Sequence, residues 1–124
     1  MDKAAREALA RAAGPANLDA SKATREAYSY DATGHRHPPE AVVRAVDTDQ
    51  VARVLAACTA HRVPVVPRGA GSGLTGGALA VAGGVVLDMA GLSRILEIRP
   101  ADQVAVVEPG VVTADLQAAA EARG

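Results

Sequence analysis

PRGAGSGLTGGA, residues 67–78, places five glycines within nine positions, directly behind the apolar run at 63–66. Glycine has no Cβ and accepts positive φ angles, so such a run lets the backbone curl and approach a ligand closely. Successive backbone N–H groups of a curled loop converge on an anion such as a diphosphate. Ser72 and Thr75 add hydroxyl donors, and Arg68 brings a fixed positive charge to the entrance. The stretch therefore predicts a loop that holds a phosphate-bearing cofactor.

The letters GSGLTG at 71–76 also satisfy G-x-G-x-x-G, the pattern of dinucleotide-binding Rossmann folds. That pattern requires a helix to open on the glycines, because the helix N-terminus is part of the anion site. Glycine pairs at 76–77 and 83–84 leave little room for a helix. A Walker loop fails because no Lys-Ser or Lys-Thr pair follows the glycines. We expect a cradle of loop amides between two strands, with a pyridine-nucleotide dehydrogenase of irregular loop as the lesser alternative.

The segment before the loop predicts a β-α-β unit. Residues 41–46 favour a strand, residues 47–49 offer N-caps, and the following helix carries an apolar face that includes Cys58. Residues 63–66 form the second strand. A parallel pair with a helical crossover places the glycine loop at the carboxyl end of a strand, where open α/β sheets bind ligands. We expect Cys58 to be a core residue, because no neighbouring motif activates its thiol.

The remaining segments predict shorter elements. An Ala-rich helix at 3–13 stops at Gly14-Pro15, and a second at 22–27 is capped by Asp19 or Ser21. We expect both to form a surface arm. After the loop come a strand at 84–89, a hairpin of 96–99 with 104–107 joined by 100–103, and a helix through Arg123 capped by Thr113 or Asp115.

Composition limits the classes of function. Hydrophobic residues make up 49% of the 124, yet Phe and Trp are absent, so Ala and Val must supply most of the core. Thirteen basic and fourteen acidic residues give no sign of nucleic-acid binding. Cys58 is the one cysteine, and the first residues are too charged for a signal peptide, so we expect a cytoplasmic location. No metal-ligand cluster or catalytic triad is visible, so no independent mechanism is predicted.

A strand ending in proline, then Arg-Gly-x-Gly-Ser-Gly-Leu-x-Gly-Gly and a short apolar strand, resembles the flavin pyrophosphate loop of the vanillyl-alcohol oxidase and p-cresol methylhydroxylase family. Within that family the sequence is most similar to the flavin subunit of glycolate oxidase and to D-lactate dehydrogenases. The resemblance covers residues 28–124, and its quoted segments are RVPVVPRGAGSGLTGGA at 62–78, GVVLDMAGLSRILEI at 84–98 and VAVVEPGVVTADL at 104–116.

The resemblance implies an α/β (α+β) fold in which residues 38–124 form the truncated first half of a PCMH-type FAD-binding domain, after a helical arm and linker at 1–37. FAD would be held non-covalently, because Ser72 stands where some members carry the histidine that bonds to the flavin. Tyr30 and Asp31 either line the edge of the flavin or belong to a solvated linker. The implied cofactor contacts are Pro67, Arg68, Gly69, Ala70, Gly71, Ser72, Gly73, Leu74, Gly76, Gly77, Pro109, Gly110 and Val111.

For the complete enzyme the resemblance implies oxidation of a 2-hydroxy acid, glycolate or D-lactate, to the 2-oxo acid. Members of this group are several times longer than 124 residues, so we expect the substrate-binding and catalytic residues to lie outside this sequence. Two alternatives stay open: a non-catalytic fragment, and half of a split flavoprotein that another chain completes. A peripheral contact of the full enzyme with the inner membrane is compatible with the resemblance.

Overall fold

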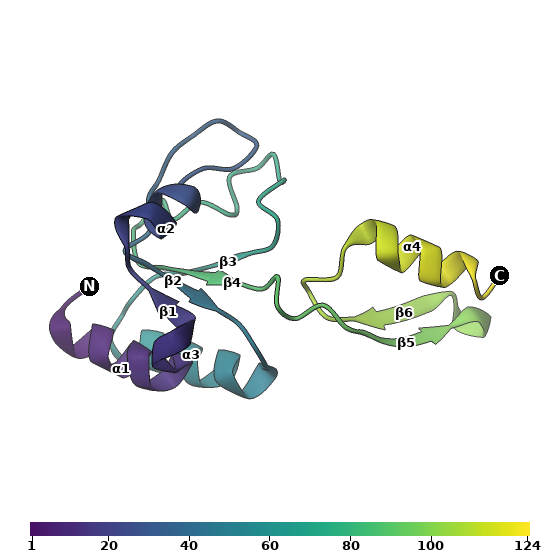
Figure 1. The fold of residues 1–124 in the computed structure, drawn as a ribbon, viewed down its shortest axis with the longest axis horizontal. Coiled ribbons are helices and arrows are strands. Elements are labelled where there is room, and N and C mark those ends of the chain that lie inside the picture. Colours follow the sequence, from purple (N-terminus) through teal and green to yellow (C-terminus); the bar gives the residue numbers. More distant parts are fainter.

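A four-stranded sheet organises the first three quarters of the chain. The structure, a computed structural model, describes residues 1–124. The strand order is β1-β2-β4-β3, with β2, β4 and β3 parallel and β1 antiparallel to β2 (Figure 1). The strands are β1 (Leu18–Asp19), β2 (Ala41–Arg44), β3 (Val65–Arg68) and β4 (Val85–Asp88).

Helices cover one face of this sheet. Figure 1 shows α1 (Lys3–Ala13) and α3 (Thr48–Ala60) together below the strands, whereas α2 (Lys22–Ala27) and two long loops lie above. The α3 helix begins after Asp47, whose carboxylate accepts a hydrogen bond from the Gln50 amide at 2.6 Å, as the capping signal predicts. Ser21 caps α2 in the same way.

The β-α-β prediction is confirmed for the parallel direction of the two strands, but the two strands are not neighbours in the sheet. Strands β2 and β3 are parallel, yet β4 lies between them and pairs with both. The second strand also begins two residues later than expected, at Val65. Pro67 is the third of its four residues and has no amide N–H to donate. Proline is tolerated there because β3 is the edge strand, and one side of it has no neighbouring strand.

The core lies between the sheet and its two covering helices. Leu9 of α1 and Val54 of α3 belong to the same cluster as Val43 of β2 and Val85 of β4. All four are fully buried. Cys58 is buried in the same cluster, as predicted. The expectation of a surface arm is wrong for α1, because its small alanines pack closely on α3 and bring Leu9 inside. The domain boundary at residue 37 stays a prediction.

A hairpin and a helix extend away from the sheet (Figure 1). Strands β5 (Ile95–Arg99) and β6 (Val104–Val107) pair as predicted and are followed by α4 (Thr113–Glu121). Neither predicted cap of α4 is used, since the N-cap is Val112 and no side chain bonds there. No residue after Leu92 is buried. A groove of about 540 Å³ lies between the hairpin and α4, lined in part by Ile98, Val104 and Leu116.

The helices are all too short or too polar to cross a lipid bilayer.

We expect Leu9→Ala to lower the free energy of unfolding by about 2 to 4 kcal/mol, because it leaves a cavity between α1, α3 and the sheet. Urea unfolding followed by circular dichroism measures this. Arg6→Ala, an exposed change on the same helix, is the control. Equal stabilities of the two variants would show that α1 does not belong to the core.

The exposed apolar residues of the hairpin unit, residues 93–124, predict self-association of the isolated chain. Leu96 and Val104 are both exposed large hydrophobic residues, and exposed apolar surface favours association. Size-exclusion chromatography with light scattering should show oligomers that a double change of both residues to Lys reduces. Val46→Lys, at an equally exposed apolar site beside the sheet, is the control. A concentration-independent monomer would contradict the prediction.

Candidate functional site

The glycine loop connects β3 to β4 without a helix. It leaves the carboxyl end of β3 at Gly69, passes over the sheet face opposite α1 and α3, and enters β4 after Gly84 (Figure 1). No helix lies between the two strands. This confirms the prediction of a strand-loop-strand arrangement, and it removes the helix N-terminus that a Rossmann anion site requires.

The backbone amides of this loop are free donors. None of the backbone hydrogen bonds of the chain is donated by an amide between Gly69 and Ala78, and the first one beyond is Leu79 N–H to Gly76 O at 3.1 Å. The hydroxyls of Ser72 and Thr75, both on exposed residues, have no hydrogen-bond partner in the chain either. Backbone donors are normally paired or left to solvent and ligands. The loop therefore offers a run of N–H groups to an incoming anion.

The glycines of the loop fall into two kinds. Gly71 has φ +71°, and a Cβ there would lie 2.2 Å from Nη2 of Arg68, so the fold itself requires glycine. A Cβ on Gly69 or Gly73 would meet nothing within 4 Å. The packing of the chain does not explain those two glycines. They leave open space along the outer side of the loop, where a ligand would approach its amides.

Arg68 lies inside the loop rather than at its entrance, which corrects the sequence-based placement. Only 8% of its surface is exposed, and it takes part in none of the ion pairs of the chain. Its guanidinium lies 5.5 Å from the centre of the Tyr28 ring and donates a long hydrogen bond, 3.5 Å, to the Ala78 carbonyl. A buried cation without an ion-pair partner favours binding of an anion nearby.

Tyr28 and Asp88 form a hydrogen-bonded pair that sequence reasoning missed. The Tyr28 hydroxyl donates to Oδ2 of Asp88 at 2.6 Å, and Oδ1 accepts from the Ala90 amide at 3.0 Å. Burial raises the pKa of the Tyr28 hydroxyl, and the hydrogen bond to the Asp88 carboxylate raises it further. Sixty positions separate the two residues, and no local pattern links them.

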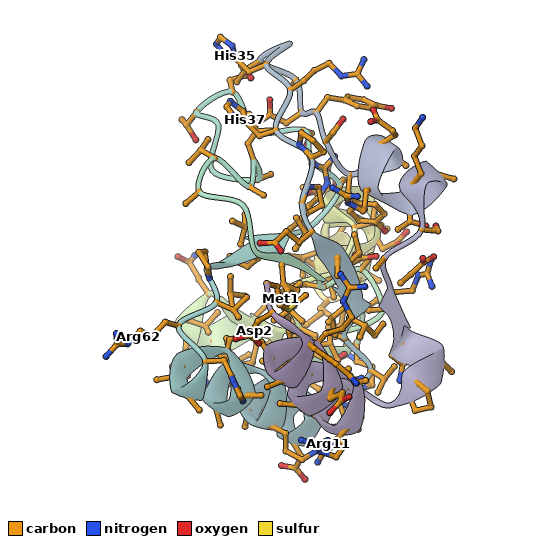
Figure 2. All side chains as sticks on the ribbon, turned by 90° about the vertical axis from the view of Figure 1, so that its left-hand side faces the viewer. Met1, Asp2, Arg11, His35, His37 and Arg62 are labelled. Atoms are coloured by element: carbon orange, nitrogen blue, oxygen red, sulfur yellow. The ribbon has the colours of Figure 1, made fainter.

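Asp31 lies buried beside the glycine loop. Both the amide and the hydroxyl of Thr33 donate to Oδ1, whereas Oδ2 is buried and has no partner. The Thr33 hydrogen bond lowers the pKa of Asp31, and the positive charge of Arg68 contributes to the same shift. Figures 1 and 2 place the surrounding loop next to the glycine loop, with His35 at its tip. Asp31 is thus not part of a solvated linker, whereas Tyr30 is half exposed.

The turn that contains Pro109, Gly110 and Val111 packs against the end of β4. The Gly110 amide donates to the Leu92 carbonyl at 2.7 Å, and a Cβ on Gly110 would lie 2.3 Å from the Met89 carbonyl oxygen. Met89 in turn donates its amide to the carbonyl of Arg68 at 2.9 Å. The turn and the start of the glycine loop are therefore both held near the carboxyl ends of β3 and β4. Internal packing explains Gly110, and its contact with a cofactor stays a prediction.

Comparison with known proteins agrees with this geometry. The family described as FAD binding domain matches residues 39–124. The glycolate oxidase subunit GlcD of Bacillus subtilis (strain 168) is 44% identical over 125 aligned positions, covering all of this chain and 27% of that protein. D-2-hydroxyglutarate dehydrogenase of Stutzerimonas stutzeri is 41% identical over 79% of this chain and 21% of its own length. D-lactate dehydrogenase of Anaerostipes hadrus is 37% identical over 69% of this chain and 18% of its own length. The chain thus spans about a quarter of the length of these relatives.

Solved structures confirm the fold. That of 4-ethylphenol oxidase from Gulosibacter chungangensis, in complex with isoeugenol, matches with a TM-score of 0.81 and 26% identity over 97% of this chain and 24% of its own. p-Cresol methylhydroxylase with substrate bound gives a TM-score of 0.75 at 24% identity, over 96% of this chain and 24% of its own. The expected α/β class and the PCMH-type topology are both confirmed.

We expect Gly71→Ala to destabilise the chain by about 1 to 3 kcal/mol, because alanine resists positive φ and its methyl group would displace Arg68. Gly73→Ala is the matched control, since its methyl group enters open space, and we expect a change within about 0.5 kcal/mol. Chemical denaturation without ligand compares the two. A Gly73 variant as unstable as the Gly71 variant would refute the distinction between the two kinds of glycine.

Proposed function

We propose a function from the premise that this chain belongs to the family of FAD-binding domains: the glycine loop holds the diphosphate of FAD. The observation that carries this assignment is the run of unpaired amides between Gly69 and Ala78, positioned at the carboxyl end of a parallel strand. The residues of the proposed site are Pro67, Arg68, Gly69, Ala70, Gly71, Ser72, Gly73, Leu74, Gly76 and Gly77, together with Pro109, Gly110 and Val111 beside the carboxyl end of β4.

The donors present suit a diphosphate. Backbone amides supply directional hydrogen bonds, the free hydroxyls of Ser72 and Thr75 add two more, and the guanidinium of Arg68 supplies positive charge beneath the loop. The open space at Gly69 and Gly73 lets phosphate oxygens approach the backbone. Because Ser72 cannot form the flavin bond of a histidine, these residues would hold FAD without a covalent link at this loop.

The unpartnered oxygen of Asp31 adds an acceptor at the border of this proposed site. Its Oδ2 is buried beside the loop and accepts no hydrogen bond in the chain. Buried carboxylate oxygens normally have a partner, so a hydroxyl of the bound cofactor is a suitable donor. This supports the part of the sequence-based expectation that placed Asp31 at the edge of the flavin.

We propose that the whole protein oxidises a 2-hydroxy acid. Three relatives carry names that specify such an acid, namely glycolate, D-lactate or D-2-hydroxyglutarate. When bound, FAD supplies the redox chemistry by accepting a hydride from the carbon that bears the hydroxyl group. The residues of this chain bind and orient the cofactor.

A second candidate is a split flavoprotein whose remaining part belongs to another chain. The observation that favours it is the hairpin unit, residues 93–124, in which no residue is buried. An apolar groove beside α4 gives such a partner a surface to cover. The association test described above distinguishes a chain that pairs with itself from one that stays free for a different partner.

We expect the purified chain to retain FAD after incubation and removal of free flavin, with the visible absorbance of bound flavin. Gly73→Ala should weaken FAD binding about tenfold, because its methyl group occupies the approach to the amides. Ala101→Ser in the distant hairpin turn is the control, with unchanged affinity. Isothermal titration calorimetry gives the dissociation constants. A chain that returns colourless and shows no heat of binding would contradict the assignment of this loop.

A further inference from the structure

We propose that Tyr28 and Asp88 are positioning residues, which hold Arg68 beneath Gly71 and thereby keep the glycine loop in the form that receives a diphosphate. The consequence for FAD rests on the function proposed above. The consequence for the loop itself does not, because the contacts that link these residues belong to the chain alone.

Asp88 occupies the centre of a charged row across the sheet. It is the last residue of β4, where its register partners are Arg44 on β2 and Arg68 on β3. Register partners share one face of a sheet, so all three side chains start from the face that carries the glycine loop. Asp88 is 9% exposed, yet it forms an ion pair with neither arginine. Its shortest hydrogen bond is instead the one that it accepts from the hydroxyl of Tyr28.

Tyr28 is fixed at both ends. Its amide ends α2 by donating to the Thr24 carbonyl at 3.0 Å, and its side chain packs on the small cluster of Val42, Ala80 and Val86. At the far end its hydroxyl is bound to Asp88 at 2.6 Å. The ring therefore has a defined orientation, and one of its faces is available to a cation.

Arg68 contacts that face of the Tyr28 ring and, on its other side, the glycine loop. Its guanidinium carbon lies 5.5 Å from the ring centre, within the range of a cation–π contact. From there it reaches the Ala78 carbonyl near the end of the loop, and its Nη2 fills the volume where a side chain of residue 71 would lie. Because the amides from Gly69 to Ala78 donate no backbone hydrogen bonds, Arg68 is the internal support of the loop.

The first test needs no cofactor. In Tyr28→Leu the guanidinium loses its ring, so the ¹⁵N relaxation of residues 69–78 should report increased nanosecond motion, while α3 is unchanged. Tyr28→Phe keeps the ring and should lie between the wild type and the Leu variant, and Asp88→Asn should resemble Tyr28→Phe. Asp102→Asn, a change of an exposed aspartate, is the control. Unchanged loop motion in the folded Phe and Asn variants and in a folded Leu variant would overturn the proposal.

A spectroscopic titration tests the pair itself. In a Tyr30→Phe background the ultraviolet signal of tyrosinate comes from Tyr28 alone. Burial raises the pKa of Tyr28 and Asp88 raises it further, whereas the charges of Arg44 and Arg68 lower it. Asp88→Asn should therefore lower the pKa of Tyr28. Because folding raises the pKa of Tyr28, its contribution to the free energy of unfolding is complete below about pH 10, the ordinary tyrosine value. That contribution is lost as the pH rises through the raised pKa. An unchanged pKa in Asp88→Asn would count against the pair.

The third test uses FAD and riboflavin. Tyr28→Leu should weaken FAD binding about tenfold, and Tyr28→Phe less, because the loop must be reordered around the diphosphate. Riboflavin lacks the diphosphate, so its affinity should be the same in all variants. Equal weakening of both ligands, or of neither, would refute the positioning role. If the wild type binds no FAD, the proposed function fails, whereas the relaxation and titration experiments still decide whether Tyr28 and Asp88 position Arg68.

Discussion

Strands β3 and β4 are parallel, so the chain must return from the carboxyl end of one to the amino end of the other, and here it does so without a helix. Most parallel crossovers use a helix that satisfies its own backbone and covers the sheet. This crossover leaves the amides from Gly69 to Ala78 without a backbone acceptor, and its buried residues are Leu79 and Ala80. The amide donors of the proposed cofactor site are available because a loop, and not a helix, connects these two strands.

A loop with few internal hydrogen bonds needs support from elsewhere. The fold supplies it from the sheet below, through a charged side chain at the end of β3, an aromatic ring at the end of α2 and a carboxylate at the end of β4. These groups come from β3, α2 and β4. They meet because β4 pairs with β3 and its Asp88 binds the tyrosine at the end of α2. The site therefore belongs to the tertiary structure, although most of its proposed ligand-facing groups lie in one short segment.

The sequence predicted what depends on local chemistry. Glycine content located the loop, apolar runs located the strands, and Asp47 located the start of α3. It did not predict what depends on distant packing. Insertion of β4 between β2 and β3 leaves no trace in periodicity, and the burial of Leu9 is hidden in a helix of small and charged residues. The inward turn of Arg68 and the bond from Tyr28 to Asp88 likewise require two segments to be placed before either is visible.

The strand order also governs how the chain acquires its structure. Residues are made in sequence, and β2 and β3 emerge from the ribosome before the strand to which both must pair. Neither parallel ladder can form until β4 has been synthesised, so folding of the sheet waits for residue 88 and is dominated by contacts between distant positions. In that interval α1 and α3 are the elements able to shield apolar surface. Packing of α1 and α3 on the apolar face of β2 and β3 would then shield these strands from aggregation before β4 is made.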